Sequence, residues 1–162
     1  MEENINIGDS TSMKTGKGFN DGIYFDVNMH IQLFDDSNNI KEERFIHNTI
    51  TTAGKYGIAD QLLAAPTLAK MGWMAIGTGT PTPTLLGAEI AKVPFDSKTR
   101  SLAVVTAIAT FGAGVGTGAI TEAGIFNSAA ADTVDMWCSA SFGVITKGSG
   151  DNLVINWQII IS

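Results

Sequence analysis

The sequence predicts a mainly β fold, an antiparallel β-sandwich of jelly-roll type with one inserted α-helix. Apolar and polar residues alternate over several segments, and turn-forming residues separate about seven such segments at sandwich-like spacing. The composition agrees, because 44% of the residues are hydrophobic, 16% are charged and 18 are glycine, against about 25% charged in an average domain. We expect residues 1–20 to form an extended or flexible arm and residues 21–162 a single β-sandwich domain.

The first strands and the helix follow from local patterns. A strand is expected from Phe25 to Leu33, where apolar residues occupy every second position. Turn residues at 36–39 lead to a second strand over 40–50, which makes a β-hairpin. Thr51 or Thr52 can cap a helix that runs to Pro66, with Ile58, Leu62 and Leu63 on its apolar face.

The rest of the chain is expected to be mostly β. We predict a strand at 71–76, a loop at 77–84 and a short helix at 85–92, because Leu86, Glu89 and Ile90 have helical spacing. Further strands are expected at 102–111, 119–126, 136–144 and 153–161. A glycine-rich loop at 112–118 and a turn at 147–152 connect them. The backbone edge of the closing strand should need pairing or protection, which an oligomer would supply.

No motif of catalysis, phosphate binding or metal binding is complete. The glycines at 112–118 do not match a dinucleotide or phosphate loop, and the acidic run at 35–39 lacks the glycine and glutamate of a calcium loop. His30 and His47 lie on paired strands, but spacing marks no further ligands beside them. Cys138 has the apolar setting of an unreactive cysteine. We therefore expect no catalytic, cofactor or metal site; a pair of acids flanking a pocket would reopen the enzyme alternative.

The charge and the termini bear on partners and location. The formal net charge is −6, which disfavours binding to phosphate backbones, so no nucleic-acid partner is expected. The first residues lack the basic and apolar regions of a signal peptide, and no apolar run approaches the roughly 20 residues of a membrane helix. We expect synthesis in the cytoplasm and no membrane partner.

The candidate contact residues come from the arm, the 77–84 loop and one tryptophan. Trp137 lies opposite the apolar set of its strand, so we expect it to face solvent or a partner. An exposed tryptophan also leaves open a carbohydrate-binding module, in which the indole stacks on sugars. The candidate partner-binding residues are Lys14, Lys17, Phe19, Thr78, Thr80, Pro81 and Trp137.

Several stretches taken in order resemble the small virion proteins of tailed bacteriophages, of the capsid decoration, head-fibre or tail-associated type. They cover roughly residues 25–162. These stretches are His47-Asn48-Thr49-Ile50-Thr51, Ile58-Ala59-Asp60-Gln61-Leu62, Met74-Ala75-Ile76-Gly77-Thr78-Gly79-Thr80, Leu86-Gly87-Ala88-Glu89-Ile90, Thr121-Glu122-Ala123-Gly124-Ile125-Phe126-Asn127 and Leu153-Val154-Ile155-Asn156-Trp157.

The resemblance implies a β-rich structural protein of the virion, made in the host cytoplasm, with no catalytic residues to carry over. The expected function is that of a capsid decoration or cement protein that binds assembled capsid subunits, most simply the major capsid protein. A homo-oligomer is expected, with a trimer as one candidate because capsids offer threefold sites. The alternatives are a tail or fibre component and the carbohydrate-binding module.

Overall fold

The computed structural model describes residues 23–131 and 135–162, and in these residues the chain forms nine β-strands and one α-helix. The mainly β prediction is confirmed. The elements are β1 (Phe25–Phe34), β2 (Ile40–Ile50), α1 (Thr52–Asp60), β3 (Trp73–Gly77), β4 (Glu89–Pro94), β5 (Ser97–Ser101), β6 (Val104–Phe111), β7 (Gly118–Phe126), β8 (Met136–Lys147) and β9 (Asn152–Ile161).

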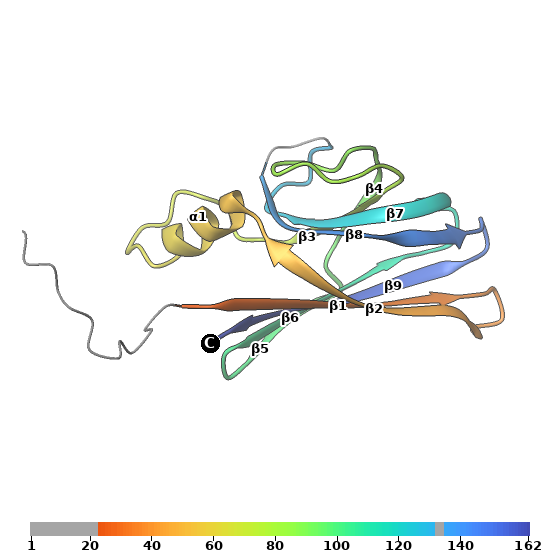
Figure 1. Cartoon of the computed structure of the whole chain (residues 1–162), viewed down its shortest axis with the longest axis horizontal. Coiled ribbons are helices and arrows are strands. Elements are labelled where there is room, and N and C mark those ends of the chain that lie inside the picture. Colours follow the sequence, from red (N-terminus) through yellow and green to blue (C-terminus); the bar gives the residue numbers. More distant parts are fainter. Residues whose placement is uncertain (1–22, 132–134) are drawn as a thin grey trace, which may run out of the picture.

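The strands form one curled antiparallel sheet. They pair in the order β4-β3-β7-β8-β2-β1-β9-β6-β5. The curl depends on a short junction, since β2 pairs with β8 only through Thr49 with Ser139 and Ile50 with Cys138. Beyond this junction the two strands separate, and β7 and β8 lie across from β1 and β9 (Figure 1).

Side chains from both parts of the curled sheet fill the space between them. The alternation in β1 and β9 is confirmed, because the residues of one face are buried in a single apolar cluster. Alternate residues of a strand point to opposite faces, so this period of two places a whole apolar set inside. The buried residues from these two strands are Val27, Met29, Ile31, Leu33, Leu153, Ile155, Trp157 and Ile159.

The predicted helix at 85–92 is wrong. Residues 89–94 form β4, which pairs with β3 through contacts such as Ile76 with Ala91. Residues 85–88 form an irregular connection. Pairing with the sheet has overridden the weak helical spacing of Leu86, Glu89 and Ile90. Strand β5, before the expected strand at 102–111, was also not predicted.

The helix begins where predicted and ends earlier. The Thr51 hydroxyl accepts a hydrogen bond from Gly54 N at 2.9 Å, so the predicted cap is confirmed. The helix ends at Asp60 rather than at Pro66, and Leu62 and Leu63 are exposed instead of packed. The buried face of α1 consists of Gly54 and Gly57, which lie against β8. Glycines carry no apolar signal, so periodicity could not identify this face.

The closing strand does not have an open edge. β9 lies between β1 and β6 and pairs with both along nearly its whole length. The expectation that an oligomer must protect this edge is therefore wrong, because strands distant in sequence supply both neighbours.

The alternation in β8 changes phase partway along the strand. Met136, Cys138 and Ala140 are buried as predicted, but Val144 is exposed and Ile145 is buried. The pairing with β7 is irregular between Ile120 and Glu122, where β8 contains extra residues. Such a bulge moves the following residues to the opposite faces of the sheet.

Candidate binding surfaces

The predicted contact loop at 77–84 is held by one buried carboxylate. Glu122 on β7 is fully buried. Its Oε1 accepts hydrogen bonds from Gly79 N at 3.0 Å and Ala88 N at 2.8 Å, and its Oε2 accepts one from Gly87 N at 2.8 Å. These bonds compensate for the cost of burying the carboxylate. We call this arrangement the Glu122 clasp.

Glycines make the clasp possible. A Cβ on Gly77 would lie 2.3 Å from the Glu122 Oε1, and one on Gly87 would lie 2.3 Å from the Thr80 carbonyl oxygen. These positions therefore require glycine because backbone and carboxylate approach closely. The clasp presents Thr78 and Thr80 exposed and Pro81 half-buried. Their role in partner binding remains a prediction. The clasp fixes the loop that carries these residues, which suits a contact surface.

Trp137 is buried, which corrects the expectation that it faces solvent. Only 5% of its surface is exposed. Its indole lies under α1, where a Cβ added to Gly57 would be 2.2 Å from Trp137 Cζ2. The tryptophan does lie on the opposite face of β8 from Met136 and Cys138, as the alternation predicted. The helix that covers this face comes from elsewhere in the sequence, so the strand pattern could not indicate its burial.

Trp137 also contributes to the lining of a pocket of about 280 Å³. Met71, Val105 and Trp137 provide apolar lining, and Lys70, Lys98 and Arg100 provide positive charge. We call this site the cationic pocket. A smaller apolar cavity of about 60 Å³ shares the same three apolar residues and is also lined by Ile159 and Ile161.

Two of the three cations of this pocket are anchored through backbone carbonyls. Lys98 Nζ donates to Met71 O at 2.5 Å, and Arg100 Nη1 donates to Leu102 O at 2.8 Å. Partial desolvation, followed by repulsion from Lys70, lowers the pKa of Lys98. Sequence reasoning missed this site because its cations and apolar residues come from separate segments.

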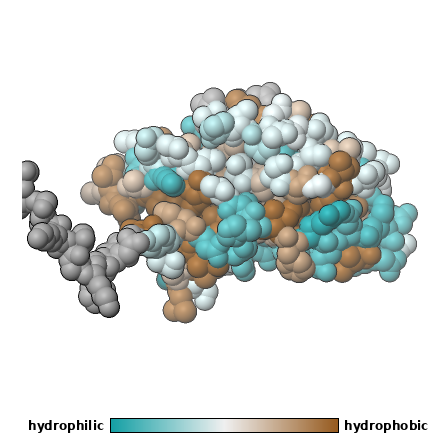
Figure 2. All heavy atoms as spheres, in the orientation of Figure 1, coloured by the Kyte–Doolittle hydropathy of each residue, from teal (hydrophilic) through white to brown (hydrophobic). Residues whose placement is uncertain are grey.

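Large apolar side chains are exposed at the same end of the molecule. Figure 2 shows hydrophobic residues gathered over α1 and the loop after it, at the left end of the view. We call this surface the α1 end. Its exposed apolar residues are Ile23, Tyr24, Tyr56, Leu62, Leu63 and Leu68.

The loop that carries the leucines of this surface is held in place by Asp60. The carboxylate accepts hydrogen bonds from the backbone N–H groups of Thr67 and Leu68, at 3.0 Å and 2.9 Å from Oδ2. These bonds lower the pKa of Asp60, because they favour the charged form. The exposed leucines are thus carried by a loop of defined conformation.

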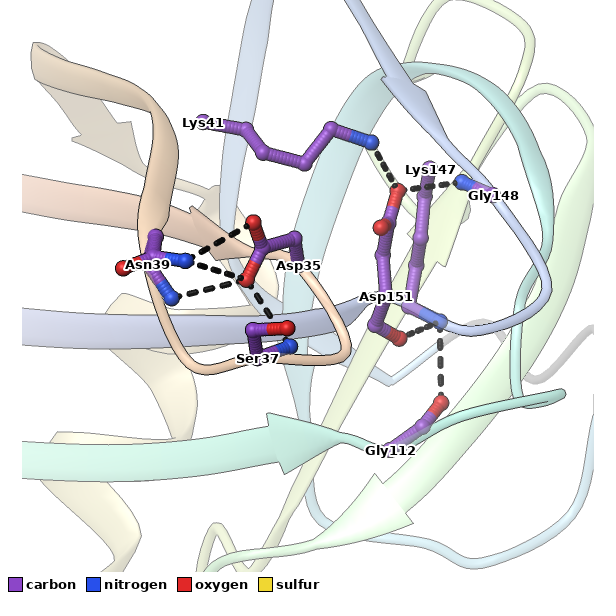
Figure 3. A network of polar contacts seen from close by, with 8 residues as sticks. All are labelled: Asp35, Ser37, Asn39, Lys41, Gly112, Lys147, Gly148 and Asp151. Atoms are coloured by element: carbon purple, nitrogen blue, oxygen red, sulfur yellow. Dashed lines mark hydrogen bonds and ion pairs between the residues drawn. The ribbon is translucent and has the colours of Figure 1, made fainter.

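The turn between β8 and β9 contains a buried lysine. Lys147 is 1% exposed and donates to the carbonyl oxygens of Gly112 at 2.8 Å and Asp151 at 2.7 Å (Figure 3). The Asp151 carboxylate accepts from Lys41 Nζ and Gly148 N, both at 2.7 Å. The Lys41 hydrogen bond is the main cause of the lowered pKa of Asp151, while desolvation lowers that of Lys147. We call this group the turn network.

Neither the turn network nor the Glu122 clasp was predicted as a unit. The sequence indicated a turn at 147–152, but neither the burial of Lys147 nor the hydrogen bonds of Glu122. One signal was present, since Lys147 is in phase with the buried Ile145. The nearby turn at 35–39 is confirmed, because the Asp35 carboxylate accepts hydrogen bonds from the backbone N–H groups of Asn39 and Ser37. The pKa of Asp35 is lowered, mainly by the bond from Asn39 N.

The two histidines lie on the outer face of β1 and β2, at neighbouring positions of the pairing. His30 stacks on Phe45 with ring centroids 4.3 Å apart and contacts the Glu43 carboxylate at 2.7 Å. His47 contacts Asp26 at 3.1 Å. His30, Phe45 and His47 line a hollow of about 380 Å³ that continues onto β9. We call it the outer hollow.

Metal ligands do not converge anywhere in residues 23–131 and 135–162, where no three His, Cys, Asp or Glu side chains form a group that could hold an ion. Cys138 is buried as expected, and burial raises the pKa of its thiol. No helix in the described part of the chain has the length and apolar character needed to cross a membrane. Lys14, Lys17 and Phe19 lie outside the described residues.

Comparisons with protein-family models, curated proteins and solved structures found no match for this chain.

Proposed function

We propose that this protein is a structural component of a tailed-phage virion, a capsid decoration protein that acts by binding other protein subunits. Its curled sheet would then be a variant of the jelly-roll sandwich. The resemblance in the ordered sequence motifs supports the phage setting. One structural observation supports the binding mode, namely the exposed apolar side chains of the α1 end.

Several large apolar side chains are exposed together at the α1 end. Leu62 is 83% exposed, Tyr56 68% and Leu63 56%. Clusters of large exposed apolar side chains favour contact with another protein, because burying them releases free energy of about 25 cal/mol per Å². The Asp60 hydrogen bonds fix the loop in advance, which reduces the entropy lost on binding.

The mechanism of such a protein is contact rather than catalysis. A domain that binds the assembled shell better than free subunits stabilises the shell through linkage. Many copies on one particle would strengthen attachment. The α1 end and the clasped 77–84 loop would supply the contacts, with the major capsid protein as partner and the virion as location. A homo-oligomer, for which a trimer is one candidate, fits threefold positions on a capsid.

The experiment is co-sedimentation of the purified full chain with undecorated shells at micromolar concentration. We expect the protein to pellet with shells and Leu62→Ser with Leu63→Ser to reduce binding at least tenfold. Val144→Ser, an exposed apolar residue on β8 outside both the α1 end and the 77–84 loop, serves as a matched control. No pelleting of the wild-type protein would overturn the decoration proposal, and pelleting with isolated tails instead would favour a tail or fibre component.

The second candidate, a carbohydrate-binding domain, depends on a different surface from the one first considered. Trp137 and Trp157 are buried, which removes them as platforms for sugar stacking. In the outer hollow, however, Phe45 is 77% exposed, and the side chains of Asn28, Asn156 and Gln158 line the same space. An aromatic ring beside amide groups suits sugar recognition. Glycan-array binding that Phe45→Ala abolishes would support this candidate, and no signal across the array would count against it.

A further inference from the structure

We infer that the cationic pocket is the docking site for the acidic, isoleucine-containing segment at residues 2–9 of this chain. The inference goes beyond the proposed function and does not depend on a virion setting. It combines the chemistry of the pocket, the sequence of the segment and the position of the first described residues.

The pocket combines apolar lining with positive charge. Met71, Val105 and Trp137 line it together with Lys70, Lys98 and Arg100. The small cavity that shares these apolar residues provides further apolar surface beneath. A ligand that fits must place apolar groups inside and negative charge near the cations, because burying either kind of surface without its complement costs free energy.

The three cations of this pocket form no ion pair with another described residue. The ion pairs formed by Lys and Arg in residues 23–131 and 135–162 involve Lys41, Arg44 and Lys92, not the three cations of the pocket. The whole chain carries a formal charge of −6. A cluster of unpaired cations on an acidic protein indicates a site for an anionic partner.

The start of the chain has the complementary chemistry. Residues 2–9 read Glu-Glu-Asn-Ile-Asn-Ile-Gly-Asp, and the first lysine comes only at Lys14. Ile5 and Ile7 could enter the apolar part of the pocket while Glu2, Glu3 and Asp9 remain near the cations. The segment therefore matches both features of the site.

The described fold begins near the pocket, so the chain before it can bring residues 2–9 to the site. Tyr24 and Ser162 exchange backbone hydrogen bonds of 2.7 Å and 3.0 Å, and the neighbouring Ile161 lines the small cavity under the pocket. The connection between Asp9 and Ile23 can span up to about 46 Å when extended. Residues 2–9 can thus reach the pocket of their own chain or that of a second copy.

Carbodiimide cross-linking of the full chain tests the inference. The reagent condenses a carboxylate with an amine to form an amide bond, so it can join Glu2, Glu3 or Asp9 to a nearby lysine. We expect mass spectrometry to find cross-links from residues 2–9 to Lys70 and Lys98 at least fivefold more often than to Lys55. Lys55 is a stringent control because it lines the same hollow as Ile23, close to where the segment joins the fold. Equal cross-linking to all three lysines would overturn the proposal.

A variant with Ile5→Ser and Ile7→Ser provides the matched control. It keeps every carboxylate and every lysine, and it changes no residue of the described fold. We expect its cross-links to Lys70 and Lys98 to fall to the level of Lys55. Because the lysines are unchanged, unusual reactivity of Lys98 cannot explain such a loss. Cross-linking that stays at the wild-type level would mean that charge alone attracts the segment, against the inference.

Mixing ¹⁵N-labelled and unlabelled chains shows whose segment is bound. Cross-links that join labelled to unlabelled peptides would place the segment in a second copy, and links within one isotope only would place it in its own chain. Both results support the pocket as the docking site. Failure of shell binding together with selective cross-linking would overturn the proposed function and leave this inference standing.

Discussion

The turn network and the α1 end differ in whether their charged and apolar groups are buried and bonded or exposed. In the turn network, Lys147 is buried and bonded to two backbone carbonyls, and Asp151 is bonded to Lys41 and Gly148. At the α1 end, leucines stand exposed beside a pocket whose cations form no ion pair with any residue in the described part of the chain. The difference indicates that the first region stabilises the fold, while the second is available for binding.

The Glu122 clasp belongs with the first kind of region and should show the largest effect on stability. Glu122→Ala leaves three partly buried backbone N–H groups without an acceptor, and an unsatisfied donor costs up to about 1–3 kcal/mol when it is buried. We expect the free energy of unfolding to fall by about 3–5 kcal/mol in urea titrations. Glu122→Gln keeps one oxygen and should lose about half as much. A loss below about 1 kcal/mol for Glu122→Ala would show that the clasp is not important for stability.

A substitution in the packed face of α1 should give the next largest loss of stability. Helix propensity alone would predict a gain in stability instead. Alanine normally stabilises a helix relative to glycine by up to about 1 kcal/mol. A Cβ on Gly54 would lie 2.1 Å from Trp137 O, so we expect Gly54→Ala to destabilise the protein by about 2–3 kcal/mol in thermal or urea unfolding. Tyr56→Ala, on the exposed side of the same helix, is the control and should change stability by less than about 0.5 kcal/mol.

The turn network should contribute to stability in a pH-dependent manner. The pKa of Asp151 is lowered from 3.8 in the fold, mainly by the Lys41 hydrogen bond. Its stabilising contribution is therefore complete at pH well above 3.8 and is lost as the pH falls through the folded pKa. We expect the free energy of unfolding to fall less steeply for Asp151→Asn than for the wild type below about pH 4. Lys41→Gln should flatten the curve in the same direction, whereas parallel curves for all three proteins would contradict this account.

Two leucines provide the sharpest contrast, because the exposed one should show the smallest effect of all. Leu62 at the α1 end is 83% exposed, and Leu86 beside the clasp is 2% exposed. Leu62→Ala should change the free energy of unfolding by less than about 0.5 kcal/mol, whereas Leu86→Ala should cost about 2–4 kcal/mol. If Leu62→Ala proved as destabilising as Leu86→Ala in the same urea assay, the α1 end would have to be regarded as part of the core.

Local patterns in the sequence determined much of this fold. The period of two placed Val27 and Trp157 inside, and the threonine before the helix predicted its cap. Such features depend on neighbouring residues alone, because strand faces alternate and a hydroxyl caps the nearest free N–H groups. The buried state of Cys138 followed in the same way.

Only the tertiary structure decided which surfaces the elements cover and which charges they bring together. Trp137 is buried because α1 lies over it, and β9 has no open edge because β1 and β6 flank it. The cationic pocket joins Lys70 and Arg100, which no local pattern connects. These outcomes depend on contacts between distant segments. A one-dimensional pattern shows which face of a strand is apolar, but not which neighbour will pack against it.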